Sequence, residues 1–263
     1  MAEIDREGVR LGFDDVGQGK PIVLVHGWGC SRKFFKPQVD ALSTHHRVIS
    51  VDLRGHGMSD APEQDYTMPV FADDIAWLCA KLGVRKPMLV GHSMGGNAIL
   101  ELAARYPDVA SGIMLIDSLL FPPANLVEQL KVAVAGLQTK DFRLVVRQLA
   151  EARFIPSDDP MRKEWILTAM ESTPQHVLVS AFARHTTEYD ASDAAERCFV
   201  PTAYIGAASP LGDVMQLKSK CPGVLVGQTL GAGHFSQLEV PDQINAMLMH
   251  FMKLCAEVRL PVN

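Results

Sequence analysis

The chain has 263 residues, of which 48% are hydrophobic, and its 25 Lys and Arg residues against 30 Asp and Glu residues give a formal net charge of −5. This composition can bury a large core and excludes a disordered chain. The negative charge disfavours general binding to nucleic acids and to anionic membranes. At roughly 150 residues per domain, the length indicates one or two domains.

Cellular location is indicated by what the sequence lacks. No run reaches the roughly 18 apolar residues that a membrane helix needs, and the first residues, MAEIDREG, have no apolar signal segment. The sequence has five cysteines: Cys30, Cys79, Cys198, Cys221 and Cys255. Their number is odd and no two form a C-x-x-C pair, which disfavours a disulfide framework and a cysteine zinc site. We therefore expect a cytoplasmic protein with reduced thiols.

In chain order, short apolar runs alternate with longer helical patterns, which is typical of an α/β protein with a mostly parallel sheet. Glu3–Asp5 and Val9–Asp15 alternate weakly and predict an antiparallel hairpin at the sheet edge. The expected parallel strands are Pro21–His26, Arg47–Asp52, Pro87–Gly91, Gly112–Asp117, Pro201–Gly206 and Gly223–Thr229. The expected flanking helices are Pro69–Leu82, Met94–Arg105, Asp213–Lys220 and Pro241–Leu254.

Residues 119–190 interrupt this alternation with apolar residues at helical spacing and no strand pattern. Four helices are expected there, around Leu126–Leu137, Phe142–Leu149, Arg162–Met170 and Gln175–Ala183. We therefore predict a core formed by residues 1–118 and 191–263, with residues 119–190 inserted as a helical cap. The tail from Glu257 to Asn263 follows the last helix, and its role stays open.

The strongest chemical motif is Gly91-His92-Ser93-Met94-Gly95-Gly96, which fits the pattern G-x-S-x-G. An expected strand precedes it and an expected helix follows it. A serine on such a sharp turn exposes its hydroxyl above the sheet, and the glycines relieve crowding around it. The motif predicts Ser93 as a nucleophile, against the alternative of a glycine-rich turn with an idle serine.

A serine hydroxyl needs a base, which is itself oriented by a carboxylate. His234, in Gly231-Ala232-Gly233-His234-Phe235, follows the last expected strand and lies at the same sheet edge as Ser93. It is the best candidate base among the nine histidines. His92 and His26 fit packing and loop-bracing roles better.

Val25-His26-Gly27-Trp28-Gly29 leaves a strand through a glycine-containing loop that can face Ser93. We expect the backbone N–H groups of Trp28 and Met94 to form an oxyanion hole. The substrate pocket is expected between Ser93 and the cap, lined by residues that flank the catalytic loops: Trp28, Leu119, Leu120, Phe121 and Phe235. Such a lining suits an apolar or aromatic molecule of moderate size.

The segments HGWG, VDLRGHGMSD (Val51–Asp60), GHSMGG and GAGHF resemble the α/β-hydrolase superfamily, in the right order over nearly the whole chain. The resemblance implies the α/β-hydrolase fold and structural roles for Asp52, Arg54 and Asp60. It does not select one activity, because this fold carries many chemistries.

Many superfamily members carry the triad acid in a G-x-x-D pattern after the strand spelled PTAYIG here, but this chain has Ser209 at that position. Asp117, at the end of the strand GIMLID, resembles the acid of haloalkane dehalogenases, a fungal resorcylic-lactone hydrolase and cofactor-free quinolone dioxygenases. Asp117 is therefore the expected acid. Asp213 remains an alternative, although it also fits a helix N-cap, and the absence of any triad acid is a third possibility.

The resulting expectation is a serine hydrolase that cleaves an ester or lactone. Carbon–carbon bond hydrolysis remains an alternative. Arg153, His176 and Arg184 are the candidates for holding the carboxylate and enol oxygens of such a substrate. A cofactor-free dioxygenase is another, although Met94 stands where those enzymes have a histidine. Ser93 excludes a haloalkane dehalogenase, which needs aspartate there. A hydrolase-like ligand receptor is the alternative from another class, disfavoured because those proteins usually carry G-H-S-V-S.

No helical spacing of His, Asp and Glu predicts a catalytic metal, and no cofactor is expected. The expected partner is a small-molecule substrate, with neither nucleic acid nor membrane involved. A homo-oligomer remains open.

Overall fold

The computed structural model describes residues 2–257, so the tail residues 258–263 lie outside the described part. Within residues 2–257 there is an 8-stranded sheet with the order β1-β2-β4-β3-β5-β6-β7-β8. The pairs β1–β2 and β2–β4 are antiparallel, and the remaining neighbours are parallel. The strands are β1 (Ala2–Arg6), β2 (Val9–Val16), β3 (Pro21–Val25), β4 (Arg47–Val51), β5 (Met88–His92), β6 (Gly112–Ile116), β7 (Thr202–Gly206) and β8 (Leu225–Gln228).

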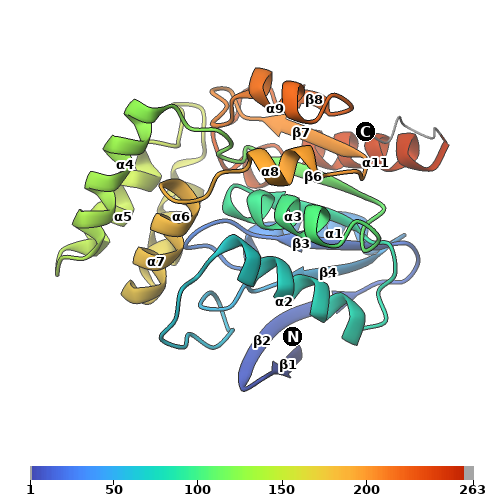
Figure 1. Cartoon of the computed structure of the whole chain (residues 1–263), viewed down its shortest axis with the longest axis horizontal. Helices are drawn as coiled ribbons and strands as arrows, with labels where there is room; N and C mark the ends of the chain where they lie inside the picture. The colour runs from blue at the N-terminus through green and yellow to red at the C-terminus, as the bar shows by residue number, and fades with distance from the viewer. Residues whose placement is uncertain (1, 258–263) are drawn as a thin grey trace.

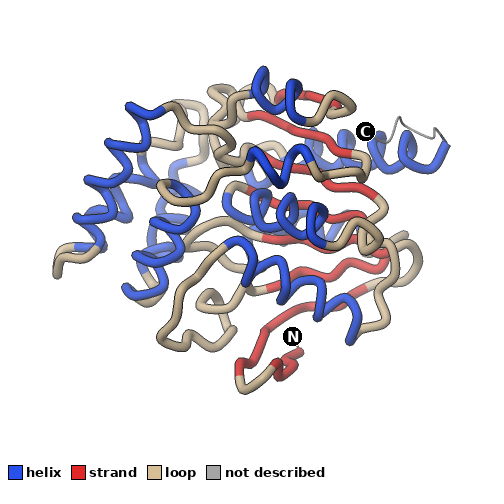
Figure 2. The backbone as a smooth tube through the Cα atoms, viewed as in Figure 1, coloured by secondary structure: helices blue, strands red, loops and turns tan. Residues whose placement is uncertain are grey.

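The central strands are apolar because both faces of the sheet are covered. Along β3, Ile22 and Leu24 pack on one face while Val23 and Val25 pack on the other, and all four side chains are fully buried. Figure 2 shows helices in front of the stacked strands and behind them, with the N-terminal hairpin at the lower edge. This two-sided covering explains the unbroken Val, Ile and Leu runs of the sequence.

The helices of the core lie between the strands, as expected from the apolar periodicity. Helix α2 begins after Thr67, whose hydroxyl accepts from the Val70 N–H at 3.3 Å, and Pro69 stands in its first turn. The core helices are α1 (Lys36–Leu42), α2 (Met68–Lys81), α3 (Met94–Arg105), α8 (Ser192–Glu196), α9 (Val214–Lys220), α10 (Ser236–Glu239) and α11 (Pro241–Glu257), with the 3-10 helix η1 (Arg32–Phe35).

Three of these helices, α1, α8 and α10, were not expected from the sequence. Each has at most seven residues, which is too short for an apolar stripe to repeat. They are stabilised by packing: α1 and α10 contact each other, and α8 contacts α3 and α9. Tertiary contacts therefore decide their formation.

Between β6 and β7 the chain forms a group of helices beside the sheet, at the left of Figure 1. These are α4 (Ala124–Leu137), α5 (Phe142–Glu151), α6 (Pro160–Glu171) and α7 (Gln175–Thr186). Helix α4 packs on α5 and α7, and α5 packs on α6. We refer to α4–α7 and their connections as the helical insertion.

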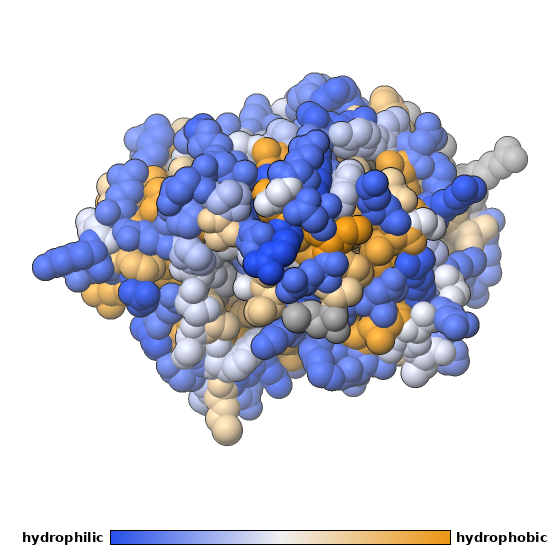
Figure 3. Space-filling view, turned by 90° about the horizontal axis from the view of Figure 1, so that it is seen from below, coloured by the Kyte–Doolittle hydropathy of each residue, from blue (hydrophilic) through white to orange (hydrophobic). Residues whose placement is uncertain are grey.

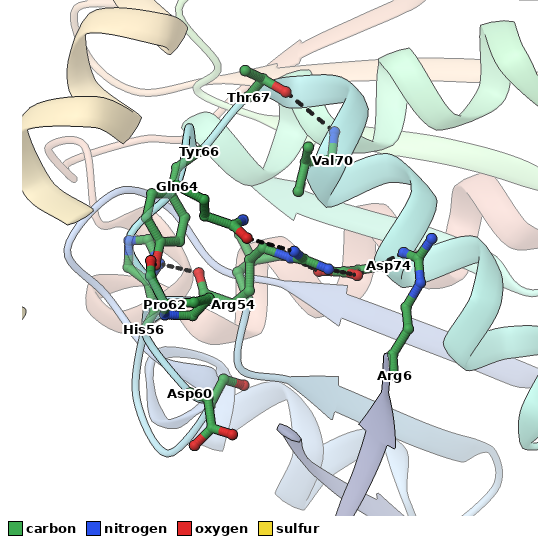
Figure 4. Close-up of polar contacts among 12 residues, drawn as sticks. Arg6, Arg54, His56, Asp60, Pro62, Gln64, Tyr66, Thr67, Val70 and Asp74 are labelled. Atoms are coloured by element: carbon green, nitrogen blue, oxygen red, sulfur yellow. Dashed lines mark hydrogen bonds and ion pairs between the residues drawn. The ribbon is translucent and has the colours of Figure 1, made fainter. Parts of the chain in front are cut away.

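The segment Val51–Asp60 is held by charged and polar contacts rather than by secondary structure. The Asp52 carboxylate accepts from the Arg32 N–H at 2.7 Å and also pairs with the Arg32 guanidinium. Asp60 pairs with Arg10 at 2.7 Å. In Figure 4, the Arg54 guanidinium lies between Gln64 and Asp74, and Arg6 approaches Asp74 from the other side. These contacts serve the loop itself and leave none of these side chains in the pocket described below.

The face on the side of the β1–β2 hairpin shows apolar residues in separate patches among hydrophilic ones (Figure 3). None of the helices within residues 2–257 combines the length and the apolar composition needed to span a lipid bilayer. All five cysteines lie in the described part, four of them buried.

Candidate active site

Ser93 lies at the sharp turn between β5 and α3. Its backbone has φ of 53° and ψ of −122°, a conformation that side-chain-bearing residues rarely adopt. A Cβ on Gly95 would lie 2.3 Å from the Val25 carbonyl oxygen. The glycine therefore allows α3 to approach β3 closely enough to form the turn, with Ser93 only 8% exposed at the head of the helix.

His234 and Asp117 form a direct side-chain pair. The His234 Nδ1–H donates to Asp117 Oδ2 at 2.7 Å, and Asp117 is 1% exposed. Asp117 follows β6 with φ of 44°. The second carboxylate oxygen accepts from the backbone N–H groups of Ala207 and Leu211, both at 3.2 Å. The carboxylate is thus fully occupied and fixes the His234 ring with Nε2 free of Asp117.

The loop after β7, where Ser209 replaces the usual acid, has a different function in this chain. Its backbone N–H groups at Ala207 and Leu211 hold Asp117, which comes from the neighbouring strand. Asp213 caps helix α9, since its carboxylate accepts from the Gln216 N–H at 2.9 Å. Of the two candidate acids, only Asp117 contacts His234 in the structure.

The loop that carries His234 is bound to the helical insertion. The His234 N–H donates to the Arg153 carbonyl at 3.0 Å, and the Gly233 N–H donates to the Asp158 carboxylate at 3.0 Å. A Cβ on Gly233 would lie 2.5 Å from that carboxylate, so glycine permits the close approach. The residues after α5 therefore determine where His234 lies.

Two further histidines, His92 and His26, lie near the site, and their rings form hydrogen bonds with backbone groups. The His92 ring donates from Nε2 to the His234 carbonyl at 2.9 Å, and burial, with the nearby His234, lowers the pKa of His92 well below 6.5. The His26 ring donates from Nδ1 to the Gly27 carbonyl and accepts at Nε2 from the Leu53 N–H. Burial lowers the pKa of His26 to about 4. Both rings are neutral structural braces, as the sequence indicated.

The backbone around Ser93 offers donors for an anionic oxygen. Met94 is the first residue of α3, so its N–H belongs to the first turn, which has no intrahelical acceptor. Across from it, the turn at Gly27 approaches so closely that a Cβ there would lie 3.0 Å from Ser93 Cβ. Trp28 follows in that turn, and its indole N–H donates to the Leu178 carbonyl of α7 at 2.9 Å.

A small cavity of about 60 Å³ lies between Ser93, His234 and the helical insertion. Its wall combines the catalytic loops with residues of α4, α5, α6 and α7: Gly27, Trp28, Cys30, His92, Ser93, Leu119, Leu130, Leu149, Ala150, Arg153, Met170, Phe182, His185, Thr186, Leu211, His234 and Phe235. The wall is mostly apolar, and the insertion closes it from above.

Two residues expected in this lining lie elsewhere. Leu120 is fully buried in the core, and its carbonyl accepts from the Asp213 N–H. Phe121 has φ of 55°, so the chain turns there, and its side chain lines a surface hollow beside Pro122 and Pro123. Trp28, Leu119 and Phe235 line the cavity.

Of the three polar residues that the sequence analysis named in the insertion, one lines the cavity and two lie elsewhere. Arg153 lines the cavity, whereas His176 contacts the Ala61 carbonyl and Arg184 pairs with Asp65 at 2.8 Å. His185 also lines the cavity and was missed by the sequence analysis. The signal was its spacing from Leu178 and Phe182 on the buried face of α7.

Within residues 2–257 no group of three or more His, Cys, Asp and Glu side chains is arranged to hold a metal ion. Ser93, His234 and Asp117 provide a hydroxyl, an imidazole and a carboxylate, with backbone N–H donors beside Ser93.

The chain is 35% identical over 159 residues to the 2-(acetamidomethylene)succinate hydrolase of Mesorhizobium japonicum, covering 59% of this chain and 57% of that protein. It therefore matches just over half of that relative's length.

Solved structures match over nearly the whole chain. Est816, described as an N-acyl homoserine lactone degrading enzyme, superposes with a TM-score of 0.84 at 25% identity, covering 95% of this chain and 100% of that one. A thermophilic esterase from Thermogutta terrifontis superposes with a TM-score of 0.86 at 24% identity, covering 97% and 99%. The family model described as alpha/beta hydrolase fold matches residues 20–241. The chain belongs to the alpha/beta hydrolase fold family.

Proposed function

We propose that this protein is a serine hydrolase that cleaves a carboxylic ester or lactone of a small molecule with an apolar body. The observation that carries the proposal is the hydrogen bond of 2.7 Å between His234 and the buried Asp117, with His234 lining the same cavity as Ser93 on its strained turn. The hydroxyl and the imidazole thus line one cavity, the carboxylate binds the imidazole, and the chain order Ser93, Asp117, His234 is the one typical of the α/β-hydrolase fold.

The proposed reaction has two stages. His234 Nε2 takes the proton of Ser93 as its Oγ attacks the carbonyl carbon, and the N–H groups of Trp28 and Met94 stabilise the resulting oxyanion. His234 then protonates the leaving alkoxide, which departs and leaves an acyl-serine. A water molecule, deprotonated by His234, attacks this acyl group, and the carboxylic acid leaves as Ser93 regains its proton. Asp117 stabilises the imidazolium in both stages.

The relatives support a hydrolase that acts on acyl bonds. One is named as a hydrolase of 2-(acetamidomethylene)succinate, and one solved neighbour is described as degrading N-acyl homoserine lactones. The mostly apolar wall supports an apolar substrate body, and the small cavity supports a short acyl group.

Labelling with a fluorophosphonate probe tests the proposal directly. We expect the wild-type protein to be labelled and the Ser93→Ala variant to remain unlabelled, with at least about a 10³-fold loss of kcat/KM on any 4-nitrophenyl ester the wild type cleaves. Ser209→Ala, an exposed serine at the usual position of the acid, is the matched control and retains labelling. Labelling of Ser93→Ala at the wild-type rate would refute the nucleophilic role.

A further inference from the structure

Arg153 is an arginine without a carboxylate partner, in the wall of the active-site cavity. It is partly buried, and burial lowers the pKa of its guanidinium. Among the described residues, no carboxylate lies within ion-pair distance of it, whereas Arg147 of the same insertion pairs with Glu164 at 2.9 Å and Glu171 at 2.6 Å. Partial burial of an unpaired cation is costly, so an anion supplied from outside is the expected compensation.

His185 stands in the same cavity wall and is also unsatisfied. It is 5% exposed, and neither ring nitrogen has a hydrogen-bond partner within the described residues. Its place on the buried face of α7 directs it toward the cavity that Arg153 lines. Burial lowers the pKa of His185 to about 3, so the ring is neutral and has one N–H to donate. A buried donor without an acceptor is destabilising unless a ligand or water supplies one.

The nearest acid cannot be that acceptor. Asp117 acts on the pKa of Arg153 through its charge. However, Oδ2 of Asp117 accepts from His234, and Oδ1 accepts from the N–H groups of Ala207 and Leu211. Both oxygens therefore already have hydrogen-bond donors, and neither forms an ion pair with Arg153 within the described residues. The guanidinium and the imidazole remain as two donors facing the space beside Ser93.

We propose that Arg153 and His185 form a carboxylate subsite, so that the substrate is an ester or lactone carrying a free carboxylate group. This inference rests on the proposed function, which states that the substrate is an ester or lactone. It adds that the substrate is negatively charged. A planar carboxylate matches the paired N–H groups of a guanidinium and accepts a further hydrogen bond from an imidazole.

A carboxylate fits this cavity better than a phosphate does. Among the described residues that line the cavity, Arg153 is the single Arg or Lys side chain. A dianionic phosphate would place its second charge near Asp117 with no further cation to balance it.

A pair of substrates that differ only in charge tests the subsite: 4-nitrophenyl hydrogen adipate and its neutral methyl ester. We expect the wild type to show at least about tenfold higher kcat/KM on the acid. Arg153→Gln should lower kcat/KM on the acid by about 10- to 100-fold, the scale of a charge-assisted hydrogen bond, and this loss should exceed the loss on the methyl ester. Arg153→Lys, which retains the charge, should keep more activity on the acid than Arg153→Gln.

Arg143→Gln is the matched control, because Arg143 is an exposed arginine on α5, the helix that precedes Arg153, and does not line the cavity. It should leave both substrates unchanged. His185→Phe should reduce activity on the acid more than on the methyl ester. Equal losses on both esters with Arg153→Gln, or equal wild-type activity on the two, would overturn the subsite.

Binding separates this inference from the proposed function. Calorimetry with monomethyl adipate on Ser93→Ala requires no acyl transfer. We expect binding that weakens at least tenfold when Arg153→Gln is added to Ser93→Ala. Equal affinity of the two variants, or no binding to Ser93→Ala, would reject the carboxylate subsite even if Ser93 is labelled by fluorophosphonate. Absence of that labelling would refute the serine mechanism, while the calorimetry would still decide the subsite.

Discussion

Asp117 illustrates how single residues are placed in this site. It leaves β6 with φ of 44°, a left-handed conformation that costs free energy for a residue with a side chain, and it is held there by three hydrogen-bond donors. Two of these donors belong to the loop whose own acid position is Ser209. The presence of Ser209 at the usual acid position and of an acid at Asp117 are therefore related. The loop after β7 binds the carboxylate of Asp117 instead of supplying a carboxylate of its own.

Replacing Asp117 by Asn should keep the size of the side chain but remove the charge that stabilises the His234 imidazolium. We expect a loss of at least about 10²-fold in kcat with a nearly unchanged melting temperature, since the matching change in a serine protease costs about 10⁴-fold. Steady-state kinetics on a 4-nitrophenyl ester, together with thermal unfolding, provide the measurement.

Asp213→Asn is the control for this substitution, because Asp213 caps α9 and does not contact His234. Its kcat should fall less than about threefold. A larger loss for Asp213→Asn than for Asp117→Asn would place the acid on the later loop. Small and equal losses would leave His234 without a functional carboxylate partner.

At the scale of elements, the closeness of α3 to the sheet decides whether the turn at Ser93 can form. A Cβ on Gly95 would meet the carbonyl oxygens of Val25 and His26 at 2.3 and 2.4 Å, and both are backbone atoms of or next to β3. Backbone cannot move aside as a flexible side chain can. Gly95 of the GHSMGG motif is thus required by the close approach of α3 to β3.

Gly95→Ala should therefore be strongly destabilising, by roughly 3 kcal/mol or more, because α3 must move away from β3. Urea unfolding followed by circular dichroism measures this change in the free energy of unfolding. Gly136→Ala in α4 is the matched control, since its Cβ would meet the flexible Val145 side chain at 3.1 Å. A helix glycine replaced by alanine there should change stability by no more than about 1 kcal/mol. Equal effects of the two substitutions would contradict the close-packing argument.

The whole molecule keeps several histidines buried and neutral. Burial lowers the pKa of His26 to about 4 and those of His56 and His185 to about 3. In the unfolded chain these side chains take up a proton near pH 6.5. Between about pH 6.5 and 4 the unfolded state therefore binds more protons than the folded state, and the free energy of unfolding falls as the pH decreases. Above pH 6.5 this loss is absent.

We expect the free energy of unfolding to decrease steeply between pH 6 and pH 4.5, with each of these histidines adding about one proton, or roughly 1.4 kcal/mol per pH unit. Urea unfolding at a series of pH values measures the slope. His185→Phe should reduce the slope by about one proton, because it removes one of the neutral rings. Parallel curves for this variant and the wild type would show that His185 takes up its proton equally in both states.

The local pattern of the sequence predicts the fold and points to Ser93 and His234 as candidate triad residues, and the resemblance to the superfamily adds Asp117. Alternating apolar runs predict the parallel strands because a sheet covered on both faces excludes polar side chains. The elbow motif selects Ser93, and the last loop selects His234. The strands end within one or two residues of their expected positions, such as Pro21–Val25 against the expected Pro21–His26.

Only the tertiary structure decided what lies around these residues. Asp117 rather than Asp213 contacts His234 because β6 and β7 are neighbours and the β7 loop supplies the N–H groups that hold it. Leu120 and Phe121 point away from the cavity because the chain turns at a positive φ, which no apolar pattern encodes. Arg153, in the connection after α5, and His185, on α7, line the same cavity through long-range packing of the insertion. A single sequence contains no local signal that two such distant residues line the same cavity, since their proximity depends on how the helices pack.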